Sequence, residues 1–259
     1  MVWRFASLDG LDGVVHGVST RRGGVSGGPF ASLNVGLHVG DAAESVVENR
    51  RRVCAAVGVE VDSLVACNQV LGNAVAWVTA SDRGRGARDR ASALEATDAL
   101  ITDSAGVTLV AFSADCPLVA LVEPQRRAIG IAHASRKGTL GLVAARTVRA
   151  MERLLGCEAG EMVAGIAPSI GPCCYEVGDE VVHEAHAALP DAERFVHRGG
   201  GRPHLDLWAA NVAQLVEAGL SPERIEVAGL CTRCHADEFF SYRAAKGPTG
   251  RFALLLGLR

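Results

Sequence analysis

The sequence predicts an α+β fold, with a mixed β-sheet sandwich core and flanking helices, in a single domain over residues 1–259. Three observations predict it. A chain of 259 residues can bury one large core. Short apolar runs rich in β-branched residues follow one another from residue 106 onward. Amphipathic helical segments separate some of these runs, without the regular alternation of a parallel βαβ fold.

The first part of the chain predicts two loops and one helix. Residues 21–36 are rich in glycine and suit an irregular loop laid over a site. Residues 41–57 carry valines at near-helical spacing, so we expect a helix capped by Asp41 and ended by Gly58. The arginine-rich residues 81–92 are typical of a mobile, solvated loop.

The second part predicts strands and two further helices. The helices are expected over 139–156 and 206–219, because apolar residues recur there on one side and each segment ends at a glycine. The expected strands lie within 106–114, 117–123, 128–134, 161–170 and 225–231.

Composition and charge exclude several classes of function. Apolar residues make up 49% and charged residues 21%, as in an ordinary soluble globular protein, and the net charge is −3. No basic stripe is present, so nucleic acid is not an expected partner. No apolar run is long enough to span a membrane, and the first residues lack the apolar core of a signal peptide. We therefore expect a cytoplasmic protein without a membrane partner, whose eight cysteines are mostly reduced.

A hairpin over residues 113–135 brings a thiol and an imidazole together. In an antiparallel hairpin, the numbers of facing residues add to a constant that the turn determines. A turn at Pro124 to Arg126 sets this sum near 249 to 251, which places Cys116 opposite His133 or within two residues of it. Facing Cβ atoms lie roughly 5 Å apart. We therefore expect the two side chains to meet.

This pair supports more than one chemistry. The imidazole can activate the thiol as a nucleophile, or both side chains can bind a metal such as zinc. The alternative is a buried cysteine packed beside a hydrogen-bonded histidine. The small residues around His133, in the segment "HASRKG", favour an approachable site.

Two other cysteine motifs have simpler explanations. "CTRCH" (231–235) has the spacing of a haem attachment site, but that chemistry requires export, so no haem is expected. The adjacent Cys173 and Cys174 could form a redox pair, although adjacent cysteines bridge only with strain. A structural role in the turn after Gly171 and Pro172 explains them better.

The order of the motifs resembles the YfiH-like laccase-domain family over some 240 residues. The matching segments are "HGVSTRRGGVSGGPFASLNVGLHVGD" (16–41), then "ENRRRV", "NQVLGN", "TDALIT", "ADC", "AHASRKG", "GIAPSIGPCCYEVG", "HLDLWAANVAQL" and "FFSYRAAKGPTGRFALLLG". The resemblance implies an α+β sandwich with a surface zinc site made by one cysteine and two histidines. Carried onto this chain, two of these ligands are Cys116 and His133.

The chain departs from the family pattern at the third ligand. The family reads Gln-Val-His-Gly where this chain has Leu71 in the third place. Because catalytic zinc usually has three protein ligands, we expect zinc to be bound weakly or not at all, unless His16 or His38 supplies the missing nitrogen. Ser135 and Ser169 also replace a glycine and a cysteine of the family pattern.

The resemblance leaves three functions open. The first is a purine nucleoside phosphorylase or adenosine deaminase, with Cys116 and His133 at its centre. Its candidate contacts to sugar or phosphate are Arg21, Asn34 and Arg243, since guanidinium groups match phosphate oxygens.

The second function is a metal-free hydrolase that acts on a muropeptide precursor, in which Cys116 attacks and His133 is the base. The third is a degenerate member that binds a small molecule or a protein partner without turnover. Copper oxidase chemistry ranks last, because the chain lacks the His-x-His clusters that several copper ions need. The sequence therefore favours an enzyme of purine nucleosides with weakened metal dependence.

Overall fold

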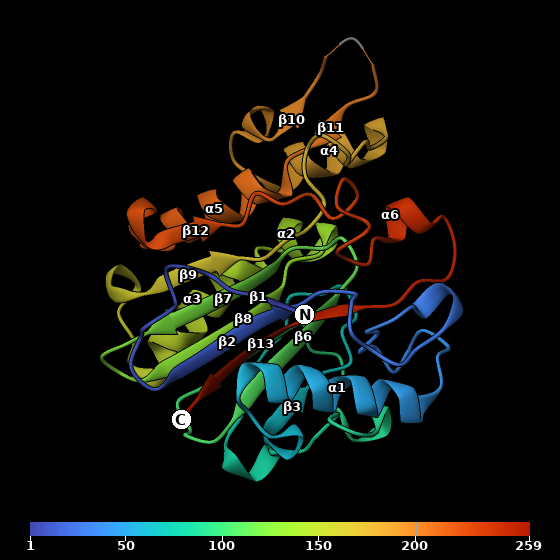
Figure 1. Ribbon diagram of the computed structural model, residues 1–259. Coiled ribbons are helices and arrows are strands. Elements are labelled where there is room, and N and C mark those ends of the chain that lie inside the picture. Colours follow the sequence, from blue (N-terminus) through green and yellow to red (C-terminus); the bar gives the residue numbers. More distant parts are fainter. Residues whose placement is uncertain (200) are drawn as a thin grey trace.

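The computed structural model describes residues 1–199 and 201–259, and two β-sheets that pack face to face form its centre (Figure 1). Within these residues, the first sheet has five strands in the order β1-β2-β13-β6-β3. The second has six in the order β12-β9-β7-β8-β5-β4, with parallel and antiparallel pairs in both sheets. The predicted α+β class with a mixed-sheet core is therefore confirmed.

The strands of the first sheet are β1 (Val2–Trp3), β2 (Val14–Ser19), β3 (Leu64–Ala66), β6 (Thr108–Ser113) and β13 (Phe252–Leu258). Those of the second sheet are β4 (Val75–Trp77), β5 (Ala99–Thr102), β7 (Leu118–Glu123), β8 (Ala128–His133), β9 (Val163–Ile166) and β12 (Ile225–Val227). A short separate pair is formed by β10 (Val196–His197) and β11 (His204–Leu205).

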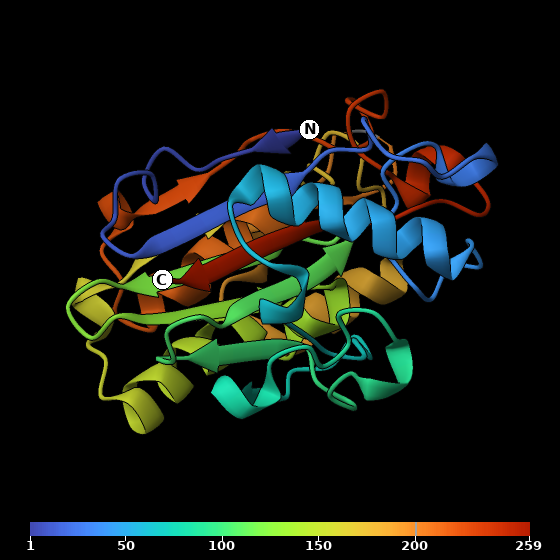
Figure 2. The same cartoon turned by 60° about the horizontal axis from the view of Figure 1, so that its bottom comes forward.

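The helices are α1 (Ala43–Val57), α2 (Arg136–Leu140), α3 (Val143–Leu155), α4 (Asp179–Ala188), α5 (Leu207–Glu217) and α6 (Tyr242–Ala245). Helix α1 covers the outer face of the first sheet (Figure 2), where Val53 and Val57 share a core with Leu255 of β13. Helices α3 and α5 cover the outer face of the second sheet. No helix in the described part of the chain has the length and apolarity needed to cross a membrane.

The alternation of side chains in β8 explains this layered core. Ile129 and Ile131 point between the sheets, whereas Ala128 and Ala132 point toward α3. Every residue of β8 is buried, as expected of a central strand that is covered on both faces. This explains why the sequence of β8 is almost continuously apolar.

The predicted hairpin register is confirmed. Strands β7 and β8 are antiparallel, and Leu118 faces His133, which gives a sum of 251. Cys116 lies two residues before Leu118, just outside the strand. The end of the hairpin therefore brings Cys116 and His133 to the same edge of the sheet.

The predicted N-cap of the first helix, Asp41, was wrong by one residue. Helix α1 has Ala42 at its N-cap, and Asp41 instead accepts hydrogen bonds through Oδ2 from Ser26 Oγ (2.6 Å) and Asn34 Nδ2 (2.8 Å). The carboxylate is thus used to hold the 26–34 loop. The predicted end is confirmed, since Gly58 adopts a left-handed φ of 86° and donates its N–H to Cys54 O.

Gly130 allows α3 to lie directly on β8. A Cβ at this position would lie 2.9 Å from Met151 Sδ and 3.2 Å from Thr147 Cγ2. We expect Gly130→Val to lower the free energy of unfolding by about 1–3 kcal/mol, because the added carbons overpack this contact. Urea denaturation measures the loss. Gly160→Val is the control, since nothing lies within 4 Å of a Cβ there, and equal losses at the two positions would contradict this explanation.

Candidate functional site

A cavity of about 610 Å³ lies at the carboxyl ends of β3, β6 and β8, with loops from both ends of the chain around it. Its lining includes Leu37, His38, Arg50, Asn68, Gln69, Leu71, Arg90, Phe112, Asp115, Cys116, His133, Tyr175, Tyr242, Arg243 and Arg251. Both members of the predicted thiol–imidazole pair therefore line one cavity.

Asp98, His133 and Cys116 lie next to one another at the edge of the cavity. His133 Nδ1 lies 2.9 Å from Asp98 Oδ1, and Cys116 is close enough to the imidazole to raise its pKa. Because Nδ1 faces Asp98, the other ring nitrogen, Nε2, is the one that reaches toward Cys116 and the cavity. His133 is only 4% exposed, so its contacts are almost entirely with protein groups.

Asp98 is held in place by backbone hydrogen bonds to residues 70–72 and to His133. Its carboxylate accepts hydrogen bonds from the N–H groups of Val70 (3.0 Å), Leu71 (3.1 Å) and Gly72 (2.8 Å). Its carbonyl oxygen accepts from the N–H of His133 at 2.8 Å. Burial would raise the pKa of Asp98, but the hydrogen bonds from His133 and from Gly72 and Val70 hold it below 3.8. Asp98 is therefore an ionised partner for the imidazole.

The environment of His133 favours its protonated form. Burial opposes the charge, but the hydrogen bond to Asp98 and the nearby Cys116 outweigh it and raise the pKa of His133 to about 9. At neutral pH the ring is therefore an imidazolium, which can donate a proton. The same charge state occurs in a Cys–His pair whose histidine has accepted the thiol proton, so the role of His133 as a base stays a prediction.

The donors in the cavity do not fit a three-ligand zinc site. Leu71 lines the cavity with a left-handed φ of 61° and a side chain that is 46% exposed, and it offers no donor atom. His16 lies elsewhere, since its Nε2 accepts from the N–H of Phe5 and its ring stacks on Phe5. His38 lines the cavity. In the described part of the chain, however, the group of side chains close enough to share a metal contains neither Cys116 nor His133.

Arginines give the cavity a positive potential. Burial, followed by the charges of Arg251, Arg90 and Arg50, lowers the pKa of His38 to about 4. Arg243 also lines the cavity, where its guanidinium lies 5.2 Å from the centre of the Tyr175 ring and donates to Glu176 O. These groups suit an anionic ligand.

The other two predicted contact residues serve the protein itself. Arg21 donates to Ala31 O and Ala236 O and stacks on Phe240, outside the cavity lining. Asn34 is completely buried, and its side chain bonds to the backbone of Gly36 and Arg251. Of the three predicted contacts, Arg243 is the one that the fold brings to Cys116 and His133.

Sequence reasoning missed several residues of the cavity. Asp98 stands directly before the buried strand β5, and a carboxylate at that position is the signal that could have identified it. Tyr175 lines the cavity, whereas Phe240 is buried in the core and Trp208 donates its indole N–H to Ser169 Oγ. The sequence does not distinguish the aromatic residue that lines the cavity from those that pack elsewhere, because all three have apolar neighbours in the sequence.

A family model described as "Multi-copper polyphenol oxidoreductase laccase" matches residues 15–259. The chain belongs to this laccase-domain family, the YfiH family. A relative from Geobacillus stearothermophilus, named purine nucleoside phosphorylase YlmD, is 42% identical over 259 residues, which cover 99% of this chain and 94% of the relative. A protein of an unknown prokaryotic organism, named adenosine deaminase RL5, is 35% identical over 240 residues, 92% of this chain and 91% of its own.

Solved laccase-domain structures share the fold. The crystal structure of the hypothetical protein YfiH from Bacillus licheniformis superposes with a TM-score of 0.93 at 37% identity, over 97% of this chain and 95% of that one. This similarity confirms the α+β architecture that the family resemblance implied.

Two serines near the cavity, Ser135 and Ser169, have local structural roles. Ser135 is the N-cap of α2, and its Oγ accepts from the N–H of Gly138 at 3.0 Å. Ser169 Oγ accepts from Trp208 Nε1 at 2.6 Å. Both serines are therefore used in hydrogen bonds that hold the loops near the cavity.

We expect Asp98→Asn to lower the pKa of His133 from about 9, because burial then acts without the carboxylate and Cys116 alone opposes it. In the wild-type protein, the pKa of His133 is higher in the folded state than in the unfolded state. Stability from this pair is therefore complete below pH 6.5 and is lost as the pH rises through about 9. The shift corresponds to about 3 kcal/mol.

NMR titration of the His133 ring and denaturation between pH 6 and pH 10 measure both effects. Asp237→Asn is the control, because Asp237 is 72% exposed in its pair with Arg22. An unchanged His133 titration in Asp98→Asn would show that the carboxylate does not determine the charge of the ring.

Proposed function

We propose that this protein cleaves the N-glycosidic bond of a purine nucleoside with phosphate as the acceptor. The observation that carries the proposal is the position of His133, which Asp98 holds at 2.9 Å in a cavity that is lined by arginines. The hydrogen bond to Asp98 helps to raise the pKa of His133, which favours a proton donor. A proton donor suits a purine leaving group, and guanidinium groups suit phosphate. The volume of about 610 Å³ is in the range of small-molecule sites. Relatives named purine nucleoside phosphorylase support the same reaction.

Arg243 and Arg90 are the proposed phosphate contacts. Arg50 and Arg251 already donate to backbone carbonyls, so they contribute chiefly through their charge. Arg90 donates its Nε to Asn68 Oδ1, and Arg243 donates Nη1 to Glu176 O. The remaining N–H groups of both guanidiniums are the proposed donors to a phosphate.

The reaction balances with the residues of the cavity. An oxygen of hydrogen phosphate forms a bond to the anomeric carbon as the bond from that carbon to the purine nitrogen breaks. The bonding electron pair leaves with the purine, and His133 protonates the purine. The proton of the phosphate group then returns to the imidazole, so the products are a sugar phosphate and a neutral purine. Asp98 holds the ring in position throughout.

Three alternatives are distinguished by their products. Deamination of adenosine, the activity in the name of one relative, releases ammonia and inosine. A metal-free Cys–His hydrolase would cleave an amide of a muropeptide precursor through Cys116. A member that binds without turnover would give no product. An imidazolium suits both reactions, because an activated Cys–His nucleophile also rests as a thiolate beside a protonated histidine. The arginines that line the cavity are the feature that favours phosphorolysis.

We expect the purified protein to convert inosine and phosphate to hypoxanthine and a sugar phosphate, and His133→Ala to lower kcat by about 10²- to 10⁴-fold. This range is typical of a lost general acid. Cys116→Ala should also lower kcat, because Cys116 lines the same cavity and helps to keep the ring protonated. Chromatography of the products, with and without phosphate, measures both activity and reaction type.

His183→Ala and Cys157→Ala are the matched controls, since His183 is exposed on α4 and Cys157 is buried behind the second sheet. Unchanged turnover in both cavity variants would exclude the roles proposed for Cys116 and His133. Release of ammonia without phosphate consumption would favour deamination.

We further propose that Leu71 occupies the position of a third zinc ligand, so that Cys116 and His133 alone hold zinc weakly in the cavity. Leu71→His adds a nitrogen beside Cys116 and His133, and we expect it to increase the zinc that Cys116 and His133 retain. Elemental analysis of Leu71→His against Leu71→Asn, with and without Cys116→Ala, measures this increase. Equal zinc contents would mean that the missing ligand belongs elsewhere.

A further inference from the structure

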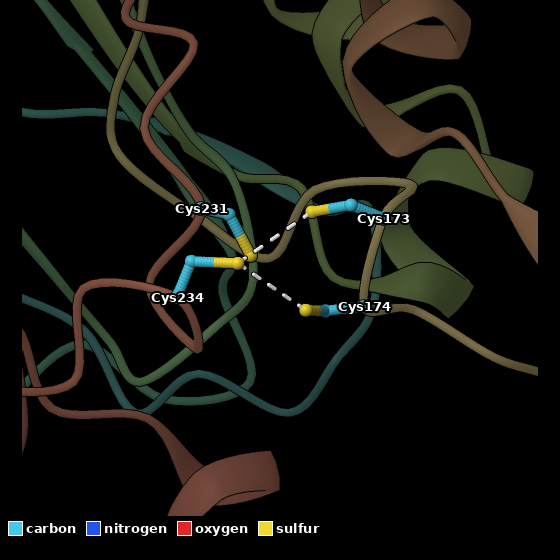
Figure 3. A group of neighbouring side chains, drawn as sticks. All are labelled: Cys173, Cys174, Cys231 and Cys234. Atoms are coloured by element: carbon cyan, nitrogen blue, oxygen red, sulfur yellow. Dashed lines mark hydrogen bonds between the residues drawn. The ribbon is translucent and has the colours of Figure 1, made fainter.

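Four cysteines converge at a second place, outside the Cys116 cavity. Cys173 and Cys174 lie in the loop after β9, and Cys231 and Cys234 lie in the loop after β12 (Figure 3). Figure 3 shows the two pairs pointing at each other from the two loops. All four sulfur atoms lie within 4.8 Å of one another, and none of these residues lines the cavity.

The distances between the sulfur atoms fit a shared metal ion. Cys234 Sγ lies 3.8 Å from Cys173 Sγ and 3.5 Å from Cys174 Sγ. A tetrahedral zinc with bonds of about 2.3 Å separates its sulfur ligands by about 3.8 Å. A disulfide requires about 2.05 Å, and all four cysteines are free thiols.

The backbone holds both loops in place around the sulfurs. The parallel bridge between Ser169 and Cys231 joins the loops, with hydrogen bonds from Ser169 N to Leu230 O and from Thr232 N to Ser169 O. In each loop a turn is closed, by Cys174 N to Gly171 O and by His235 N to Cys231 O. The four sulfurs are thus brought together by contacts that need no metal.

Gly171 allows the first cysteine loop to pass close to the second. A Cβ at this position would lie 2.7 Å from the Trp208 ring and 3.3 Å from Cys231 Cβ. The close approach of the two loops beside the sulfurs therefore requires a glycine.

We propose that Cys173, Cys174, Cys231 and Cys234 bind one Zn²⁺ in a tetrahedral structural site. Binding releases the thiol protons to solvent and forms four Zn–S bonds, with no change in oxidation state. Four thiolate ligands leave no open position for water, so the site stabilises structure and does no catalysis. This inference does not rest on the proposed phosphorolysis, because the two sites share no residue.

The zinc site supports one wall of the cavity. Cys174 is followed by Tyr175, which lines the cavity, and Cys231 is followed by Thr232, whose Oγ1 donates to Asp115 Oδ1 at 2.6 Å. Asp115 also accepts from the N–H of Arg243 at 2.7 Å. The metal would tie together the two segments that present Tyr175 and Arg243.

Elemental analysis of the full-length protein, expressed with zinc and purified under reducing conditions, tests the proposal. We expect one zinc per chain that remains in the Cys116→Ala/His133→Ala double variant. It should be lost in Cys173→Ser and in Cys234→Ser, which alter exposed side chains and leave the core intact. Cys157→Ser is the control and should keep its zinc. Replacement by Co²⁺ should give the absorption of a tetrahedral thiolate site.

Removal of the metal should lower Tm by roughly 5–10 °C, and added zinc should restore it. Three results would overturn the proposal: no zinc in protein with reduced thiols, zinc that follows Cys116 and His133 instead, or iron in place of zinc. Native disulfides between the four cysteines, detected by mass spectrometry, would also overturn it and would indicate a redox pair.

Discussion

The arrangement of the cavity depends on the hydrogen bond between Asp98 and His133. A carboxylate with no exposed surface is costly to bury unless every oxygen is paired, and this one is paired by His133 and by three N–H groups of residues 70–72. The same carboxylate therefore helps to determine the charge of the imidazole and the path of the 70–72 loop. Removing it would disturb both at once.

The hairpin could be predicted from sequence because its turn and its apolar runs are local. Pro124 to Arg126 interrupt two buried runs, and the arithmetic of antiparallel pairing then placed Cys116 within reach of His133. Asp98 was not found in this way, since it reaches His133 from 35 positions away through a pairing of β5 with β8 that no local pattern encodes. Arg21 and Asn34 were predicted from their residue types alone. Residue type does not show whether a polar side chain binds a ligand or hydrogen-bonds to the protein backbone.

The backbone, and not the side chain of Leu71, holds the 70–72 loop against Asp98. The conformation of residues 70–72 is held by backbone N–H groups that donate to Asp98, and the side chain of Leu71 takes no part in these bonds. A substitution at this position changes which donors face the cavity and leaves the loop path unchanged. The chemistry of the site can therefore change independently of its shape.

Strand β13 lies between β2 and β6 in the middle of the first sheet, although it follows all other strands in the chain. A growing polypeptide cannot complete this sheet until residues 252–258 have left the ribosome. Until then β2 and β6 expose unpaired edges, and long-range pairings of this kind form slowly. Arg251, directly before this strand, lines the cavity, so an incomplete chain also lacks part of the cavity wall. The first sheet and the cavity are therefore completed together, at the end of synthesis.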